Sequence, residues 1–276
     1  MSSACPRSRT SDTMATLMIV VGVLMCLATA YALRGGLFAP RKTKIVGMDL
    51  RGLAFGALSV AAAMWFFGPL FGIAIIIAVV IHEYGHVAAF RVAGHADARF
   101  RLIPLMGGVA ISDTMPDSQE KDFFITLMGP AIGLGPMILA LGLSGIMWDI
   151  SEQAAVFLST FAVVTGALNF FNLLPVWPLD GGHMMRVIAH AFWPPLAYLL
   201  AIAMSAALVI TAIGMQSYVL LFFALLGVHS LASSDMLAQV EHPLSRKRAL
   251  LATGAYFFTA ATFFVGGGYS FFQRFL

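Results

Sequence analysis

The feature that most constrains this chain is an apolar run that begins near Phe71 and ends in the motif H-E-Y-G-H at residues 82–86. Residues four apart in an α-helix lie one turn above each other, so the two imidazoles point to the same side. Two such histidines supply two of the three protein ligands of a catalytic zinc site and leave the glutamate free as a general base. Because charged groups inside a membrane helix are costly, the motif predicts a functional metal site.

Apolar segments of similar length recur along the 276 residues, of which 60% are hydrophobic and 11% are charged. Soluble globular domains carry about a quarter charged residues. The composition therefore predicts an all-α polytopic membrane protein in contact with the lipid bilayer. The net charge of +3 is small and the basic residues cluster beside apolar segments, which favours lipid headgroups over nucleic acid as partners. Two cysteines, Cys5 and Cys26, cannot build a disulfide framework.

Helices long enough to span a bilayer are expected at about eight places, with six as the lower bound. The expected spans are 14–33, 50–67, 71–92, 123–148, 154–174, 196–214, 218–236 and 249–272. Small residues at 28, 30 and 32 leave open that the first segment is a cleaved signal peptide.

Basic residues predict the orientation of these spans. Between Arg34 and Arg51 the chain has five lysines and arginines, against two before the first span. The positive-inside rule places this loop in the cytoplasm and the amino terminus outside. We therefore expect a multi-pass protein of the plasma membrane, with the H-E-Y-G-H motif in the cytoplasmic half of its span.

Residues 99–113 alternate like a β-strand but are too short to cross a membrane. Irregular backbone at membrane depth is tolerated only where protein or a wet cavity covers it. The segment predicts a short re-entrant β-like hairpin beside the metal site. The polar stretch 112–122 that follows is expected to be a solvated connector.

A second motif, N-L-L-P-V-W-P-L-D-G-G-H at residues 172–183, ends the fifth span. Its two prolines and its glycine pair are expected to break the helix and to present Asp180 on an irregular segment. A carboxylate there would complete a three-ligand metal site with His82 and His86. Taken alone, Asp180 could equally well serve a turn or cap a helix.

Three polar residues near this motif are further candidates. Asn172 could offer its amide to a developing oxyanion, or could instead make an interhelical hydrogen bond. Asn169, three residues earlier, is expected to be structural. His183 could orient a metal ligand from outside the site or serve structure alone. The remaining histidines, His95, His190, His229 and His242, are expected to be structural or solvated.

The two motifs together resemble the site-2 protease family of intramembrane zinc metalloproteases, peptidase family M50. The L-M-G-G-V stretch at 105–109 and Gly129-Pro130 are similar to that family as well, and the resemblance covers about two fifths of the chain. It implies a three-helix catalytic core and one Zn²⁺ per chain held by His82, His86 and Asp180. It also implies cleavage of a membrane-spanning protein substrate. The residues between the motifs leave no room for the PDZ domain of many relatives, and no CBS domain is expected.

The resulting hypothesis is an intramembrane zinc metalloendopeptidase, with Glu83 as general base and Asn172 as a second catalytic residue. It divides the chain into a disordered tail (1–13), N-terminal transmembrane helices (14–70), a catalytic core (71–183) and C-terminal transmembrane helices (184–276). A regulatory membrane protein is a further expected partner. The alternatives are a divalent-metal transporter, although the other spans carry almost no carboxylates, and a non-catalytic binder of membrane helices, which an intact Glu83 disfavours.

Overall fold

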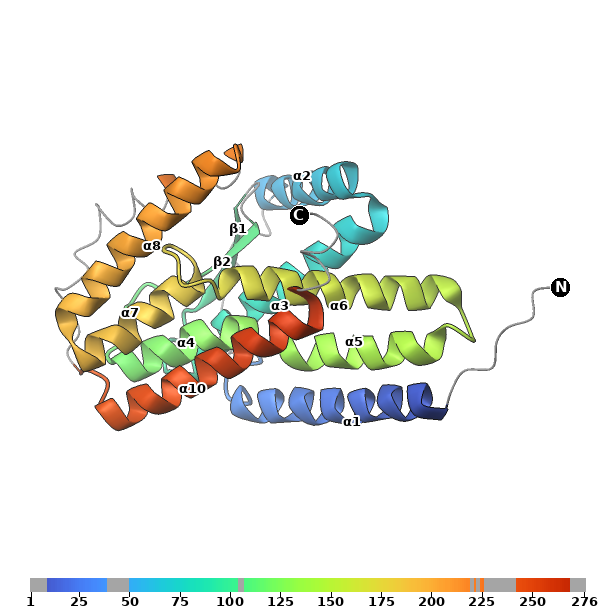
Figure 1. The fold of residues 1–276 in the computed structure, drawn as a ribbon, viewed down its shortest axis with the longest axis horizontal. Helices are drawn as coiled ribbons and strands as arrows, with labels where there is room; N and C mark the ends of the chain where they lie inside the picture. Colours follow the sequence, from blue (N-terminus) through green and yellow to red (C-terminus); the bar gives the residue numbers. More distant parts are fainter. Residues whose placement is uncertain are drawn as a thin grey trace.

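A computed structural model of the chain describes residues 9–38, 50–103, 107–218, 221, 224–225 and 242–268. Within them the chain is a bundle of helices with one pair of short strands (Figure 1), which confirms the predicted all-α class. The elements are α1 (Arg9–Ala32), α2 (Leu50–Phe67), α3 (Pro69–Val92), β1 (Arg99–Ile103), β2 (Gly107–Ile111), α4 (Gln119–Ala131), α5 (Leu134–Met147), α6 (Glu152–Asn172), α7 (Asp180–Phe192), α8 (Pro194–Gly214), α10 (Arg246–Phe263) and the π-helix η1 (Phe264–Gly268).

Six segments of the described residues are long and apolar enough to cross a membrane, so the chain is a multi-pass membrane protein. They are Asp12–Ala32, Pro69–Val92, Gln119–Met147, Glu152–Asn172, Pro194–Gly214 and Arg246–Gly267. The predicted second span is a helix over the same residues, Leu50–Phe67. Most of the predicted span 218–236 lies outside the described residues. The number of spans beyond six therefore stays a prediction.

Three boundaries differ from the expected ones. Helix α1 begins at Arg9, so residues 9–13 are helical, with Asp12 placed favourably in the first turn. The expected span 123–148 is two helices that meet near Gly133, where Pro136 has no N–H to donate to the Ile132 carbonyl. Helix α7 was not expected at all. Its buried positions recur at helical spacing, so one apolar face packs on the core.

Helix α1 packs tightly against α5 through glycines on both helices. A Cβ atom added to Gly22 would lie 2.6 Å from the backbone nitrogen of Leu139, and one added to Gly135 would lie 2.7 Å from that of Cys26. Small residues of this kind let membrane helices approach backbone to backbone. The first span is thus packed against the rest of the bundle through α5.

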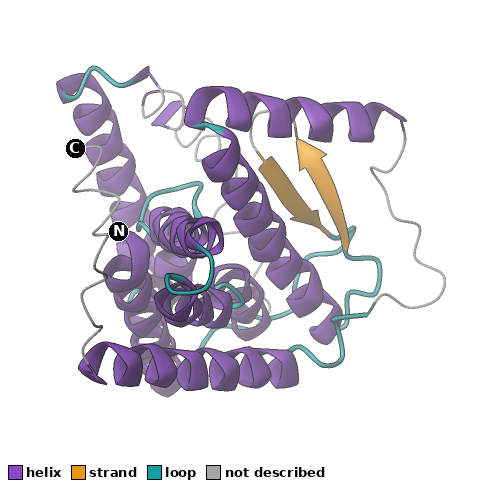
Figure 2. Cartoon of the chain, turned by 90° about the vertical axis from the view of Figure 1, so that its right-hand side faces the viewer, coloured by secondary structure: helices purple, strands orange, loops and turns teal. Residues whose placement is uncertain are grey.

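The two strands form an antiparallel pair beside the helices (Figure 2), with Arg99 opposite Ile111 and Ile103 opposite Gly107. Strand β2 packs against α3, and β1 packs against α2. The predicted hairpin is therefore present as a paired segment whose tip, residues 104–106, lies outside the described residues. Its depth in a membrane stays a prediction.

Charged side chains close the base of this hairpin. Asp97 accepts hydrogen bonds from the backbone N–H of Asp113, at 2.6 Å, and from the Ser112 hydroxyl. The N–H of Asp113 is the main cause that holds the pKa of Asp97 below its ordinary value. Arg99 donates two hydrogen bonds to Asp113 and lowers the pKa of that carboxyl in turn. The two ends of the hairpin are thus fixed to each other.

Candidate metal centre

Helix α3 carries the two histidines of the first motif on its buried side. His82 is 4% exposed and His86 is 8% exposed. Two glycines make room for them against α4. A Cβ atom at Gly129 would lie 2.1 Å from Nε2 of His86, and one at Gly85 would lie 2.2 Å from the carbonyl oxygen of Met128. The glycines therefore serve close packing of α3 on α4 and space for an imidazole.

The aspartate of the second motif reaches the same place from the other side. Helix α6 ends at Asn172, and Asp180 is the first residue of α7 rather than part of an irregular segment. The two glycines after it do not loosen the backbone but let α7 begin directly on the turn that follows α6. A Cβ atom at Gly181 would lie 2.1 Å from the carbonyl oxygen of Leu173.

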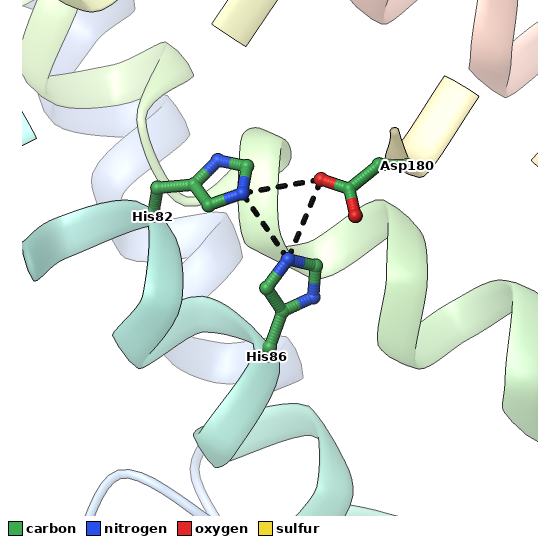
Figure 3. Close-up of side chains that lie close together, drawn as sticks. All are labelled: His82, His86 and Asp180. Carbon is green, nitrogen blue, oxygen red and sulfur yellow. Dashed lines mark hydrogen bonds and ion pairs between the residues drawn. The ribbon is translucent and has the colours of Figure 1, made fainter. Parts of the chain in front are cut away.

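Three ligand atoms converge where these elements meet (Figure 3). Nε2 of His82 lies 3.2 Å from Nε2 of His86, and Oδ2 of Asp180 lies 3.1 Å from the first and 3.4 Å from the second. A tetrahedral zinc site with metal–ligand bonds of about 2.0–2.1 Å places its ligand atoms about 3.3 Å apart. The three separations fit such a site.

Hydrogen bonds on the far side of each ring set the direction of its lone pair. Nδ1 of His86 lies 2.9 Å from the carbonyl oxygen of Ile125, which can only accept. Nδ1 of His82 lies 2.7 Å from Oδ1 of Asn169, whose amide nitrogen donates to the Thr165 carbonyl. Both rings therefore carry their hydrogen on Nδ1 when neutral, and both Nε2 lone pairs point at the shared space.

This space suits a cation and little else. Two lone pairs and a carboxylate oxygen face one another, and Oδ2 of Asp180 is buried without a hydrogen bond. Buried polar atoms are normally paired, and an orphaned anionic oxygen is costly. Nitrogen and carboxylate donors of this kind suit Zn²⁺. Elsewhere in the described part of the chain, no group of three His, Cys, Asp or Glu side chains converges in this way.

Glu83 lies between the two histidines in sequence but is not one of the three converging groups. It is half-buried, and its carboxylate interacts with the backbone N–H of Ala110 on β2. The same carboxylate feels the charges of His86, His82 and Asp180. Glu83 therefore lies between the metal group and the hairpin.

The two asparagines have a different arrangement from the expected one. Asn169, expected to be structural, is fully buried and bonds directly to His82. Asn172 is the half-buried last residue of α6, and within the described residues no hydrogen bond joins it to His82, His86 or Asp180. Its part in catalysis stays a prediction. The sequence feature that could have revealed this role of Asn169 is its amide in the middle of an apolar span, where such a group requires a hydrogen-bond partner.

His183 acts on the fold around the site. Its Nε2 lies 2.8 and 2.9 Å from the two carboxylate oxygens of Asp122, and the Trp177 ring stacks on it at 5.7 Å. Asp122 belongs to α4, so the pair ties the start of α7 to the start of α4. The end of the expected solvated connector, residues 119–122, is thus the first turn of α4, where Gln119 is buried and its side chain accepts a hydrogen bond from the N–H of Leu244.

Known proteins resemble this chain in sequence. Residues 145–213 match the model of peptidase family M50. A zinc metalloprotease of Methanocaldococcus jannaschii is 33% identical over 131 residues, which are 48% of this chain and 37% of that protein. Stage IV sporulation protein FB of Bacillus subtilis is 28% identical over 117 residues, 41% of this chain and 38% of that protein.

Among solved structures, a site-2 protease from Methanocaldococcus jannaschii is 21% identical, with a TM-score of 0.46, over 75% of this chain and 100% of that chain. The chain spans somewhat more than a third of the length of the two curated relatives. The family model and these relatives confirm the resemblance that the two motifs predicted, and the M50 segment includes Asp180.

Proposed function

We propose that the chain, a relative of the site-2 zinc metalloproteases, is an intramembrane zinc metalloendopeptidase that hydrolyses a peptide bond within or near a transmembrane segment of another protein. One observation carries the proposal. The ligand atoms of His82, His86 and Asp180 converge at zinc spacing inside a bundle of apolar helices. A metal site in that position is costly to build, which favours a catalytic role over a structural one.

The residues around the site divide the chemistry between them. His82, His86 and Asp180 would hold the zinc ion, with Asn169 and the Ile125 carbonyl fixing the two rings. Bound there, zinc supplies an activated water and polarises the carbonyl of the scissile bond. Glu83 takes the proton of the attacking water and passes it to the leaving amine.

The hairpin suits a substrate that has left its helical form. A transmembrane helix hides its backbone in internal hydrogen bonds, so it must unwind locally before cleavage. The N–H of Ala110 reaches Glu83, which places it on the edge of β2 that faces away from β1. An extended substrate would pair along this edge. Gly108 lies two residues before Ala110, so its N–H is on the same edge of β2, and a proline there has no N–H to donate. Unchanged cleavage in Gly108→Pro would therefore exclude edge pairing.

The proposed location is the plasma membrane, with the site toward the cytoplasm and a regulatory membrane protein as a further partner. Basic residues support this orientation. Arg248 at the start of α10 pairs with Glu120 of α4. Asp122, two residues after Glu120 in the same helix, pairs with His183 of α7. The basic start of α10 therefore lies at the same end of the bundle as the metal group, and positive charge marks the cytoplasmic side.

The test is cleavage of a single-span substrate by the full chain reconstituted in vesicles, comparing the wild type with Glu83→Gln. We expect Glu83→Gln to slow cleavage by about 10²- to 10⁴-fold, the usual contribution of a general base, while its zinc content stays that of the wild type. Zinc flux into the same vesicles is measured in parallel. Flux that is equal in both proteins, with no cleavage by either, would instead establish transport.

A further inference from the structure

The ends of α1 and α3 lie side by side and form an open pocket whose lining includes none of the metal-group side chains. Its volume is about 430 Å³, and its lining residues are Tyr31, Ala32, Arg34, Gly35, Arg91 and Val92. Arg91 donates to the Gly36 carbonyl, and the Tyr84 hydroxyl donates to the Leu37 carbonyl. The segment after α1 is thus fastened to α3, so both arginines belong to one surface.

Neither arginine of this pocket has an acidic partner among the described residues. The Arg34 guanidinium lies 4.1 Å above the ring of Tyr31. Arg91 donates to two carbonyl oxygens, at 3.4 and 3.1 Å, and its Nε is buried without a hydrogen bond. By contrast, Arg99 and Arg248 each pair with a carboxylate. The pocket therefore holds two positive charges that no side chain of the described chain neutralises.

The pocket also lies at the ends of two candidate membrane spans, where lipid headgroups are expected. Arg34 follows the membrane-spanning segment Asp12–Ala32 by two residues, and Arg91 is in the last turn of the segment Pro69–Val92. Apolar side chains on the last turns of α1, such as Leu24 and Leu27, are more than half exposed and suit acyl chains. Three more basic residues, Arg41, Lys42 and Lys44, follow in the sequence.

We propose that this pocket binds the phosphate group of an anionic phospholipid. Guanidinium groups present N–H donors in a planar fork that matches phosphate oxygens, and basic pockets between membrane helices take anionic headgroups. The negative ends of the α1 and α3 dipoles disfavour an anion here, but each carries only about half a charge. The lipid would bridge α1 to the helix that carries His82 and His86.

The experiment titrates the detergent-solubilised full chain with dihexanoyl phosphatidylglycerol, dihexanoyl phosphatidylcholine or inorganic phosphate, and follows binding by native mass spectrometry. We expect phosphatidylglycerol to bind most tightly. Arg34→Gln should weaken it about fivefold, the equivalent of about 1 kcal/mol per basic residue at a membrane surface. Arg34→Lys keeps the charge but loses the planar fork, so its affinity should lie between those of the wild type and Arg34→Gln. Because Arg34 is exposed, its replacement tests the proposal even if Arg91→Gln does not fold.

Arg246→Gln is the matched control, since Arg246 is an exposed arginine at the start of another span, α10. It should bind phosphatidylglycerol like the wild type. Equal binding of the two lipids, or an equal loss in Arg246→Gln, would overturn the pocket as an anionic-lipid site. Inorganic phosphate that binds as tightly as phosphatidylglycerol would overturn the lipid as its ligand and leave a free-anion site.

Discussion

The metal group has two halves that are built in different ways. His82 and His86 lie on one uninterrupted helix, so helix geometry alone brings them together. Asp180 begins a helix after a turn, and contacts from distant parts of the chain hold it there. Gly181 packs on the Leu173 carbonyl, Tyr256 donates to that same carbonyl, and His183 bonds to Asp122. The first half is therefore local in origin, and the second depends on tertiary packing.

The largest expected effect comes from removing the ligand of the second half. Asp180→Ala should weaken zinc binding by more than about 100-fold, because loss of an outer partner alone typically costs about 10- to 100-fold. Competition with a chelator of known affinity measures this. Asp117→Ala, which removes an exposed carboxylate, should bind zinc normally. Normal zinc affinity in Asp180→Ala would mean that the two histidines do not share a metal with it.

The next effect probes the first half. Asn169→Ala removes the acceptor that orients His82 and should weaken zinc binding about 10- to 100-fold. Asn172→Ala should leave zinc affinity unchanged, since its side chain does not bond to the ligands. If Asn172 serves an oxyanion, its replacement lowers kcat by about 10²- to 10³-fold instead. A loss of zinc in Asn172→Ala, with none in Asn169→Ala, would reverse these assignments.

A smaller effect tests the packing beneath Asp180. Gly181→Ala places a methyl group against backbone atoms of Leu173 and should destabilise the protein by about 1–3 kcal/mol, as overpacking does. Thermal unfolding of the zinc-loaded protein measures it. Gly254→Ala in α10 is the control, because a Cβ there meets no atom within 4 Å and alanine favours helix. Equal Tm values for the two variants would show that the turn tolerates a side chain.

The smallest effect concerns one buried hydrogen bond. Tyr256 is 4% exposed, and its hydroxyl donates to the Leu173 carbonyl at 2.6 Å. Tyr256→Phe should cost about 0.5–1.5 kcal/mol in free energy of unfolding. The exposed Tyr198 offers the matched change, Tyr198→Phe, which should cost nothing measurable. Should zinc affinity also fall in Tyr256→Phe, the second half depends on α10 more directly than its contacts indicate.

These differences explain what the sequence could predict. Spacing along one helix predicted that His82 and His86 share a site, and apolar length predicted the six spans found within the described residues, because both signals are local. Proline and glycine placed Asp180 correctly at the end of a span but suggested irregular backbone. Its helical start depends on a close fit to Leu173, which only the folded chain supplies. Asn169 was missed for the same reason, since its partner is 87 residues away.

The contact of α3 with α4 limits how this bundle can open. Gly85 and Gly129 leave no side chain between the two helices, so their backbones meet and an imidazole fills the remaining gap. Sliding or rotating α3 against α4 would drive backbone into backbone and displace His86. The wall of the site on this side is therefore fixed. Any movement that admits a large molecule has to occur elsewhere around α3, whose other neighbours within the described residues are α2, α6 and the hairpin.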